Sequence, residues 1–449
     1  MRSDWKEISI RDACLKSITG GTPSSRNMDF YDGGTIPWLN TKEVDFCRIY
    51  KTDKFITELG FHKSSAKWIP ENSVIVAMYG ATAGKVALNK IPLTTNQACC
   101  NLVIDNKKAN YEFIYYYLSN SFSKLANLSN GAAQQNLNTS IINNFPISLP
   151  PLQEQKYIAH FLGSLDNKIE LNRQMNETLE SMAQALFKSW FVDFDPVIDN
   201  ALAAGNPIPD ALKAKASQRA EQLKTATQNG EPPAVNRELF PSEFSFTDEL
   251  GWIPRGWEVS NVGDEFDVTM GQSPPGSSYN DSGDGDYFFQ GSTDFGFRFP
   301  SPRIYCTEPK RKANKLDTLV SVRAPVGDIN LANHDCCIGR GLAAVRHISG
   351  SASFTYYSIM QLSENFKVYE GEGTVFGSIN QKTFKSLNQL KISVPEIKLF
   401  EEYAGSFDSK IESNSIQIES LSKLRDTLLP KLLSGELRIA NAATLVEGV

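Results

Sequence analysis

Apolar residues recur about every 3.5 positions between Pro150 and Asp195, and this spacing predicts one long helix over 151–195. Pro150 and Pro151 suit the start of the helix, and Pro196 is expected to end it. Two neighbouring lines of the expected helix are apolar, with Ile158, Leu165, Leu179 and Leu186 on one and Leu162, Ile169, Ala183 and Trp190 on the other. A narrow stripe of this kind is the seam along which two helices pack.

The same pattern returns 242 residues later, where LDNKIELN at 165–172 becomes FDSKIESN at 407–414. This repeat predicts a second long helix over 395–436. Neither helix has enough apolar surface to be stable alone in water, so we expect the two to pack antiparallel through their seams. Asn172 and Asn414 fall in the seams, where a buried Asn fixes the register of paired helices. Exposure at a helix end is the alternative for both residues.

Residues 1–150 and 251–394 repeat one order of short elements. Each copy begins with a short strand and a turn-rich loop, GGTPSS in the first and GQSPPGSS in the second, followed by an aromatic strand, IPWLN or YFFQG. Next comes a hairpin that we expect to turn at glycine, over Asn72–Leu88 in one copy and Asp317–Leu331 in the other.

The second part of each copy is an aromatic helix, over Tyr111–Leu125 or Phe354–Phe366. A polar loop then aligns GAAQQNLN with GTVFGSIN. We therefore predict an α+β fold of two similar domains separated by two long antiparallel helices, with an internal pseudo-twofold repeat. Residues 196–250 are expected to be a linker with one surface helix over Asp210–Gln228, and 437–449 a frayed tail.

Length and composition agree with several folded units. The chain has 449 residues, of which 41% are hydrophobic, too many residues for one ordinary core. Seven cysteines form no CxxC pattern, which favours a reducing compartment. The N-terminus is charged, and no apolar run approaches the ~18 residues of a membrane helix. We expect a soluble, cytoplasmic protein without a membrane partner.

Net charge leaves nucleic-acid binding open. The whole chain is −6, but 1–150 carries 16 Lys+Arg against 12 Asp+Glu, and 251–395 carries 14 against 15. The excess acidity therefore lies mainly on the helices and connectors, and the two domains are free to present local basic patches.

Catalytic motifs are incomplete. GATAGK at 80–85 is one residue shorter than a phosphate-binding loop and lacks the following Ser or Thr, so we interpret it as a hairpin turn. DFG at 294–296 lacks the other kinase motifs, and the four histidines do not have metal-ligand spacing. Cys336 and Cys337 are adjacent in a strand and must face opposite sides, so a buried pair is the preferred interpretation. The chain also lacks a methyltransferase tetrad and a clustered nuclease site, and we expect a protein that is not an enzyme, with no metal or cofactor in this chain.

Polar and basic side chains recur at matching loop positions in both domains, and such side chains reach base edges and phosphates. For any single residue, a solvated loop is the alternative. The candidates for DNA binding are Thr22, Ser24, Asn40, Tyr79, Lys85, Gln134, Gln135 and Asn138 in the first domain, and Ser273, Gln290, Lys310, Arg311, Lys312, Arg323, Asn380 and Lys382 in the second. We predict that Arg323, at the tip of its hairpin, contacts guanine, and that its structural counterpart lies near Tyr79.

These phrases, in this order and duplicated, resemble the specificity subunit of type I restriction-modification enzymes. The first half matches in GGTPSS, IPWLN, NSVIVAMYGATAGKVAL, ISLPPLQEQ and LDNKIELNRQ, and the second in LGWIPRGWE and LLPKLLSGEL; WFVDFDPV at 190–197 is similar to the end of the first conserved helix. The second copy departs from the pattern, because KLFEE at 398–402 replaces PLQEQ and Arg425 stands where the first helix has Ala183.

The resemblance implies two target-recognition domains, 1–150 and 251–394, that read double-stranded DNA as a bipartite asymmetric target. It also implies two adenine-N6 methyltransferase subunits, which would carry S-adenosylmethionine, and restriction subunits as partners. Roughly 35 helical residues span ~50 Å, enough to hold the domains about one DNA turn (~34 Å) apart. The rival hypothesis is a cytosolic scaffold whose two domains bind peptides or proteins; an independent hydrolase is disfavoured by the missing site.

Overall fold

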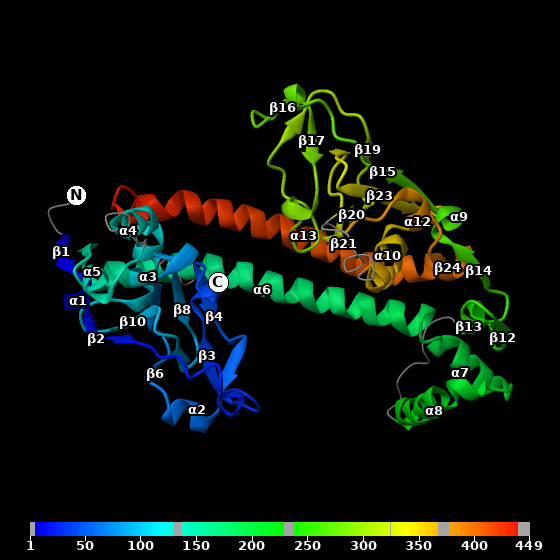
Figure 1. The fold of residues 1–449 in the computed structure, drawn as a ribbon, viewed down its shortest axis with the longest axis horizontal. Helices are drawn as coiled ribbons and strands as arrows, with labels where there is room; N and C mark the ends of the chain where they lie inside the picture. Colours follow the sequence, from blue (N-terminus) through cyan, green and yellow to red (C-terminus); the bar gives the residue numbers. More distant parts are fainter. Residues whose placement is uncertain (1–4, 130–135, 229–236, 324, 367–376, 439–449) are drawn as a thin grey trace. The chain divides into compact units, whose positions relative to one another are not determined.

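The computed structural model describes residues 5–129, 136–228, 237–323, 325–366 and 377–438 (Figure 1). The chain divides into two compact units. Unit 1 comprises Met1–Arg173 together with Ser415–Val449, and unit 2 comprises Gln174–Asn414. Each unit contains one of the repeated domains and a part of each long helix, so the border between the units lies inside the helices.

The described residues of unit 1 form three sheets. Its two-stranded sheet pairs β1 (Lys6–Ser9) with β11 (Pro146–Leu149). Its five-stranded sheet has the order β2 (Cys14–Thr19), β10 (Cys99–Ile104), β7 (Val74–Ala77), β8 (Val86–Asn89) and β4 (Cys47–Ile49). Its four-stranded sheet has the order β5 (Lys54–Ile56), β3 (Ile36–Leu39), β9 (Leu93–Thr95) and β6 (Trp68–Ile69). Strands β3 and β9 are parallel.

Short helices pack against the five-stranded and the four-stranded sheet of unit 1 and complete its core. They are α1 (Ile10–Ala13), α2 (Glu58–His62), α3 (Tyr111–Asn120), α4 (Phe122–Ser129) and α5 (Thr139–Asn143). The predicted aromatic helix is α3 followed by α4, and Asn110 caps its start by accepting from the N–H of Phe113. Phe113 packs in one apolar cluster with Leu432 and Leu433 from the end of the second long helix. The C-terminal part of the chain therefore belongs to the core of unit 1.

Unit 2 repeats this arrangement. Its two-stranded sheets pair β12 (Phe244–Thr247) with β13 (Gly251–Pro254), and β14 (Glu258–Asn261) with β24 (Asn388–Lys391). Its four-stranded sheet has the order β15 (Phe266–Met270), β23 (Leu342–His347), β20 (Thr318–Val322) and β21 (Val326–Leu331). Its five-stranded sheet has the order β16 (Tyr279–Asn280), β18 (Tyr305–Cys306), β17 (Asp286–Phe289), β22 (Cys336–Ile338) and β19 (Lys312–Ala313). Its helices include α9 (Val262–Glu265), α10 (Ala352–Phe366) and α12 (Gln381–Lys385).

Both predicted hairpins are present, as the antiparallel pairs β7 with β8 and β20 with β21. The first turns through Gly80 and Gly84, both with positive φ. The expectation of a glycine turn is wrong for the second hairpin, because Gly327 lies inside β21. Its connection contains Arg323 and Pro325 instead. Proline restricts its own φ to about −65°, so it favours a turn in which no glycine is required at that position.

The two long helices are α6 (Leu152–Phe191) and α13 (Val394–Leu433). Within unit 1 they are joined by Asn172, whose side-chain amide donates to the Gln417 side chain at 2.6 Å. Within unit 2, Asn414 donates to the Asn176 side chain at 2.9 Å. Asn172 is 1% exposed and Asn414 is 3% exposed, so both lie in the seam and the alternative of an exposed helix end is wrong.

The described residues after the first long helix form more helix than their sequence predicts. Pro196 does not end α6; it lies in the first turn of α7 (Asp195–Ala204), where proline needs no N–H partner. The predicted surface helix is present as a short turn, η4 (Asp210–Leu212), followed by α8 (Lys213–Gln228). The buried Asp199 of α7 binds the guanidinium of Arg219 of α8 at 2.6 Å, which joins these two helices.

Candidate nucleic-acid interface

In unit 1, several loops meet at the turn between β9 and β10. The N–H of Asn96 donates to the carbonyl of Leu39 at 3.0 Å, which joins the turn to the end of β3. The N–H of Met78 donates to the carbonyl of Ala98 at 2.8 Å, which joins it to the end of β7. Leu137 in turn donates its N–H to the carbonyl of Met78 at 2.9 Å. The residues that follow these anchors are therefore held around one turn.

Unit 2 has the same three backbone hydrogen bonds around the turn between β22 and β23. Gly339 donates to the carbonyl of Phe289 at 2.8 Å, and Val322 donates to that of Gly341 at 2.8 Å. Ile379 donates to the carbonyl of Val322 at 3.1 Å. The backbone frame that presents the loop residues is thus repeated between the units.

The glycine-rich loops approach these turns closely. The N–H of Gly21 donates to the carbonyl of Thr95 at 2.8 Å, and a Cβ on Gly20 would stand 2.0 Å from the same oxygen. A Cβ on Gly271 would stand 2.1 Å from the carbonyl oxygen of Gly339. Neither position can accept a side chain without moving the backbone, so glycine is needed to bring the loop against the turn.

We name the polar side chains at the two turns cluster 1 and cluster 2. Cluster 1 consists of Thr22, Asn40, Tyr79, Gln97 and Asn138, and cluster 2 consists of Ser273, Gln290, Arg323, Arg340 and Asn380. Members correspond in the order given. Tyr79 forms an isolated bridge with Asn136, and Arg323 forms one with Ser378. The two residues thus occupy corresponding positions, as the sequence predicts.

Two members of the clusters are not among the predicted residues. Gln97 and Arg340 are exposed at the tips of their turns. The hydroxyl of Thr22 bonds to the side-chain oxygen of Gln97, and Nε of Arg340 donates to the hydroxyl of Ser273 at 3.4 Å. Aligning TTNQACC with CIGRGLA at a shift of 243 residues would have revealed this pair.

The asparagines of the clusters also shape the local backbone. Asn138 and Asn380 are the N-caps of α5 and α12, each accepting from a helix N–H at 2.9 Å. Asn40 accepts from the N–H of Lys42 at 3.1 Å at the start of the short turn η2 (Thr41–Glu43). These side chains therefore have a structural role besides any contact with a ligand.

The other predicted residues lie outside the clusters. Lys85 is paired with Asp45 at 2.7 Å, and Lys312 with Asp286 at 2.8 Å, so each of these positive charges has a nearby carboxylate. The remaining exposed candidates are Ser24, Lys310, Arg311 and Lys382. Gln134 and Gln135 lie outside the described residues.

Other kinds of site receive no support in the described parts of the chain. They contain no group of three or more His, Cys, Asp or Glu side chains that could hold a metal ion, and no helix there is long and apolar enough to cross a membrane. Cys336 and Cys337 are buried in separate apolar clusters, as expected for adjacent strand residues. Burial raises the pKa of Cys336 to about 12, which opposes formation of a reactive thiolate.

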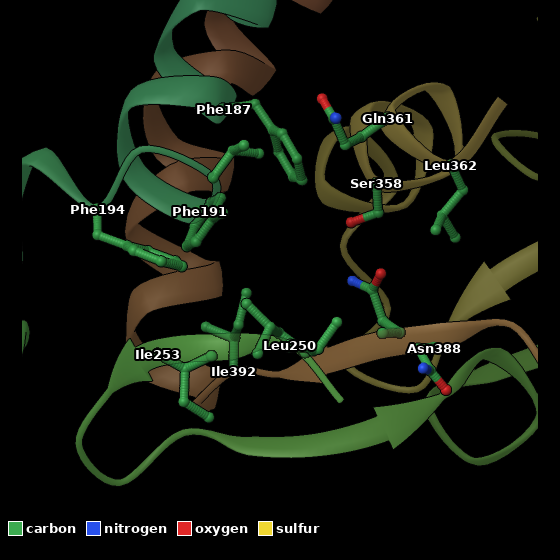
Figure 2. Close-up of a pocket in the computed structure, with 13 residues that line it drawn as sticks. Phe187, Phe191, Phe194, Leu250, Ile253, Ser358, Gln361, Leu362, Asn388 and Ile392 are labelled. Atoms are coloured by element: carbon green, nitrogen blue, oxygen red, sulfur yellow. The ribbon is translucent and has the colours of Figure 1, made fainter. Parts of the chain in front are cut away.

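A cavity of about 370 Å³ lies in unit 2 beside the end of α6 (Figure 2). Its walls are mainly apolar and include Phe187, Phe191 and Ile392, and its polar lining residues are Ser358, Gln361, Asn388 and Gln389. None of the residues that line it is titratable. The cavity thus offers packing surface rather than acid–base chemistry.

The comparisons with known proteins agree with the duplicated frame. A family described as "Type I restriction modification DNA specificity domain" matches residues 2–181 and 254–414. The putative type I restriction enzyme MjaX specificity subunit of Methanocaldococcus jannaschii is 31% identical over 460 residues, covering 97% of this chain and 94% of that protein. The chain belongs to the family of type I restriction-modification specificity subunits.

A further relative and a solved structure extend the comparison. The HindI specificity subunit of Haemophilus influenzae is 27% identical over 481 residues, covering 97% of this chain and all of that protein. A crystal structure of the type I S subunit from M. genitalium has a TM-score of 0.56 at 16% identity, with 95% and 96% of the two chains covered, and so shares the fold. The relatives are named as specificity subunits, and their names indicate no catalytic activity.

Proposed function

We propose that this specificity subunit reads a bipartite, asymmetric DNA target, with cluster 1 reading one half-site and cluster 2 the other. The observation that carries the proposal is the repeated backbone frame, which presents different side chains at equivalent positions. The described part of cluster 1 has no cation, whereas cluster 2 has Arg323 and Arg340. Arginine pairs most often with guanine in the major groove, so we expect at least one guanine in the half-site of cluster 2.

The exposed cations near cluster 2 would contact phosphates. Arg311 accepts the N–H of Ile338, the last residue of β22, through its carbonyl at 2.9 Å, and this bond keeps Arg311 beside the same strand end. Lys310 is its exposed neighbour, and Lys382 lies in the first turn of α12. Phosphate contacts position a protein on DNA without specifying sequence.

The long helices would carry the partners. In this proposal, two adenine-N6 methyltransferase subunits bind along them and receive the bound target, and restriction subunits join that complex in the cytoplasm. S-adenosylmethionine would be held by the methyltransferase subunits. The specificity subunit itself would perform no chemistry.

Mapping N6-methyladenine across the host genome, with and without this gene, tests the proposal. One two-part motif with an unread spacer should lose its methylation when the gene is deleted. The rival hypothesis, a scaffold that binds peptides, predicts no change in methylation. It also predicts weak salt dependence of DNA binding, whereas phosphate contacts give a steep decrease of affinity with salt.

A further inference from the structure

Arg298 is a buried cation in the loop that follows β17. Its side chain is 1% exposed, and Nη1 donates to Asp408 of α13 at 3.0 Å. Nη2 donates to the hydroxyl of Tyr357 at 2.8 Å and lies 3.4 Å from the carboxylate of Glu180 of α6. The guanidinium also lies over the ring of Tyr356, 4.0 Å from its centre. One loop residue therefore contacts both long helices and α10.

Unit 1 has a corresponding contact, which reaches the helix carboxylate through a tyrosine. Arg48, in β4, bonds through Nη1 to Asn167 of α6, and through Nη2 to the hydroxyl of Tyr116 at 3.2 Å. Tyr116 then donates its hydroxyl to Asp166 of α6 at 2.6 Å. Asp166 and Asp408 correspond in the repeat of the long helices, and the tyrosines lie on the corresponding helices α3 and α10. Each domain therefore inserts one arginine toward the same carboxylate position.

In each unit, the arginine follows a member of the cluster on the same stretch of chain. Asn40 precedes Arg48 by eight residues, and Gln290 precedes Arg298 by the same number. The last strand residue before each connection is Leu39 in unit 1 and Phe289 in unit 2. Its carbonyl accepts a hydrogen bond from the turn that carries the cluster, and this bond fixes the start of the connection. A buried cation needs all its partners in place, because an uncompensated charge is costly away from water. The buried end of the connection is thus held more firmly than an ordinary surface loop.

We propose that Arg48 and Arg298 are positioning residues for DNA recognition, which hold the loops of cluster 1 and cluster 2 in a fixed orientation on the long helices of their own unit. This inference rests on the proposed function. Loss of Arg298 would leave the phosphate-contacting cations in place but let Gln290 and its neighbours move relative to α13. Sequence discrimination would then fall more than overall DNA affinity.

The test uses the full chain assembled with its methyltransferase subunits. Methylation rates are measured on the target duplex and on duplexes with one base pair changed in either half-site. Arg340→Gln first identifies the half-site that cluster 2 reads. Arg298→Met should lower discrimination in that half-site by roughly tenfold, a part of what one base contact provides, and leave the other half-site unchanged. Arg298→Lys, which keeps the charge, should restore part of it.

Arg303→Ala is the matched control. Arg303 belongs to the same connection but pairs with Asp294 rather than with the long helices, and its side chain is 59% exposed. Its substitution should leave discrimination unchanged. If Arg298→Met fails to fold, Tyr357→Phe, which removes one hydrogen bond to Arg298, should still lower discrimination in the same half-site.

Two results would overturn the positioning role. One is unchanged discrimination in a folded Arg298→Met protein, and the other is an equal loss in both half-sites or in binding to random DNA. Failure of the proposed function is distinguishable, because the wild-type complex would then show no preference among the duplexes.

Discussion

The two units differ in which part of the molecule supplies the cation that binds the corresponding aspartate of the long helix. In unit 2, Asp408 binds Arg298, a cation supplied by the recognition domain. In unit 1, Asp166 binds Arg425 at 2.8 Å, a cation supplied by the other long helix. Arg48 therefore lacks that carboxylate as a direct partner, and Glu112, at 3.6 Å, is the acid that it contacts.

The difference follows from one position in the helix repeat, since Ala183 of α6 stands where α13 has Arg425. Burial raises the pKa of Glu180, and Arg298 opposes this rise. Burial alone would lower the pKa of Arg298, but the surrounding tyrosines and carboxylates outweigh this effect. The backbone frame is thus the repeated part of the fold, whereas the charges that join domain to helix are particular to each unit.

The largest expected effect is the difference in stability lost when Arg298 or Arg48 is replaced. Arg298→Met leaves Glu180 and Asp408 without their shared cation in a buried site, and should destabilise unit 2 by about 3–5 kcal/mol. Arg48→Met should cost unit 1 less, because Arg425 still pairs with Asp166. Urea unfolding followed by hydrogen exchange in each unit measures both. An equal loss of stability for the two substitutions would contradict the difference inferred between the two units.

A second difference between the units is a buried titratable residue. His347 at the end of β23 is 4% exposed, whereas the corresponding residue of β10 is Ile104. Burial lowers the pKa of His347 from 6.5 to about 4, so the unfolded chain binds this proton more tightly. The stability contributed by the neutral ring is complete above pH 6.5 and declines as the pH falls toward 4, by up to about 3 kcal/mol.

His347→Ile copies unit 1 and should remove this loss of stability in acid. Hydrogen exchange of β23 at pH 7 and pH 4.5 measures the effect, with β10 as the internal reference. The carboxylate of Glu265 lies 3.9 Å from Nε2 of His347 and is left unchanged in this substitution.

The clusters themselves can be exchanged at one position. Arg340→Gln should cost about 1–3 kcal/mol of binding to the native target and change the base preferred at one position of one half-site. Gln97→Arg, the reciprocal change, should alter only the other half-site. Motif mapping by methylation reads both outcomes. A uniform decrease of affinity on all sequences would make Arg340 a phosphate contact instead.

Arg323→Ala applies the same test to the predicted hairpin tip. Loss of a base contact should relax one position in the half-site of cluster 2, at a cost of about 1–3 kcal/mol. Tyr79→Ala is its counterpart in unit 1 and should affect the other half-site. Unchanged binding would place Arg323 outside the interface.

The smallest effect concerns the helix seam. Replacing both Asn172 and Asn414 by Leu removes one inter-helix hydrogen bond in each unit, each of about 1 kcal/mol. If these residues fix the register, the substituted chain should also form alternative assemblies with the proposed methyltransferase partners. Sedimentation of the complex checks this, and one unchanged species would show that the register is set elsewhere.

Local patterns predicted the elements of the fold well. The helix seam depends on periodic burial, whereas the hairpin strands β7, β8 and β20 are buried along their whole length. Both kinds of apolar pattern are visible along the chain. Pro196 misled because proline suits the first turn of a helix as well as the region beyond its end, and only the backbone distinguishes the two.

The candidate site was harder to predict, because its members meet only after folding. Nothing in TTNQACC distinguishes Gln97 from an ordinary turn residue, and nothing in FGFRFP marks Arg298 for burial. Arg298 is buried because α6, α10 and α13 bring three partners to it from distant parts of the chain. Comparing the two halves with each other recovers such positions, since the backbone frame is repeated where the side chains differ.

The core of unit 1 contains residues from both ends of the chain, and this determines the order in which the two units can fold during synthesis. Unit 2 is one continuous stretch, Gln174–Asn414, and can fold once that stretch has left the ribosome. Unit 1 includes the first residues made, yet its apolar cluster contains Leu432 and Leu433. The domain translated first is therefore completed last, and a nascent chain cut short within α13 would leave an open core at its opposite end.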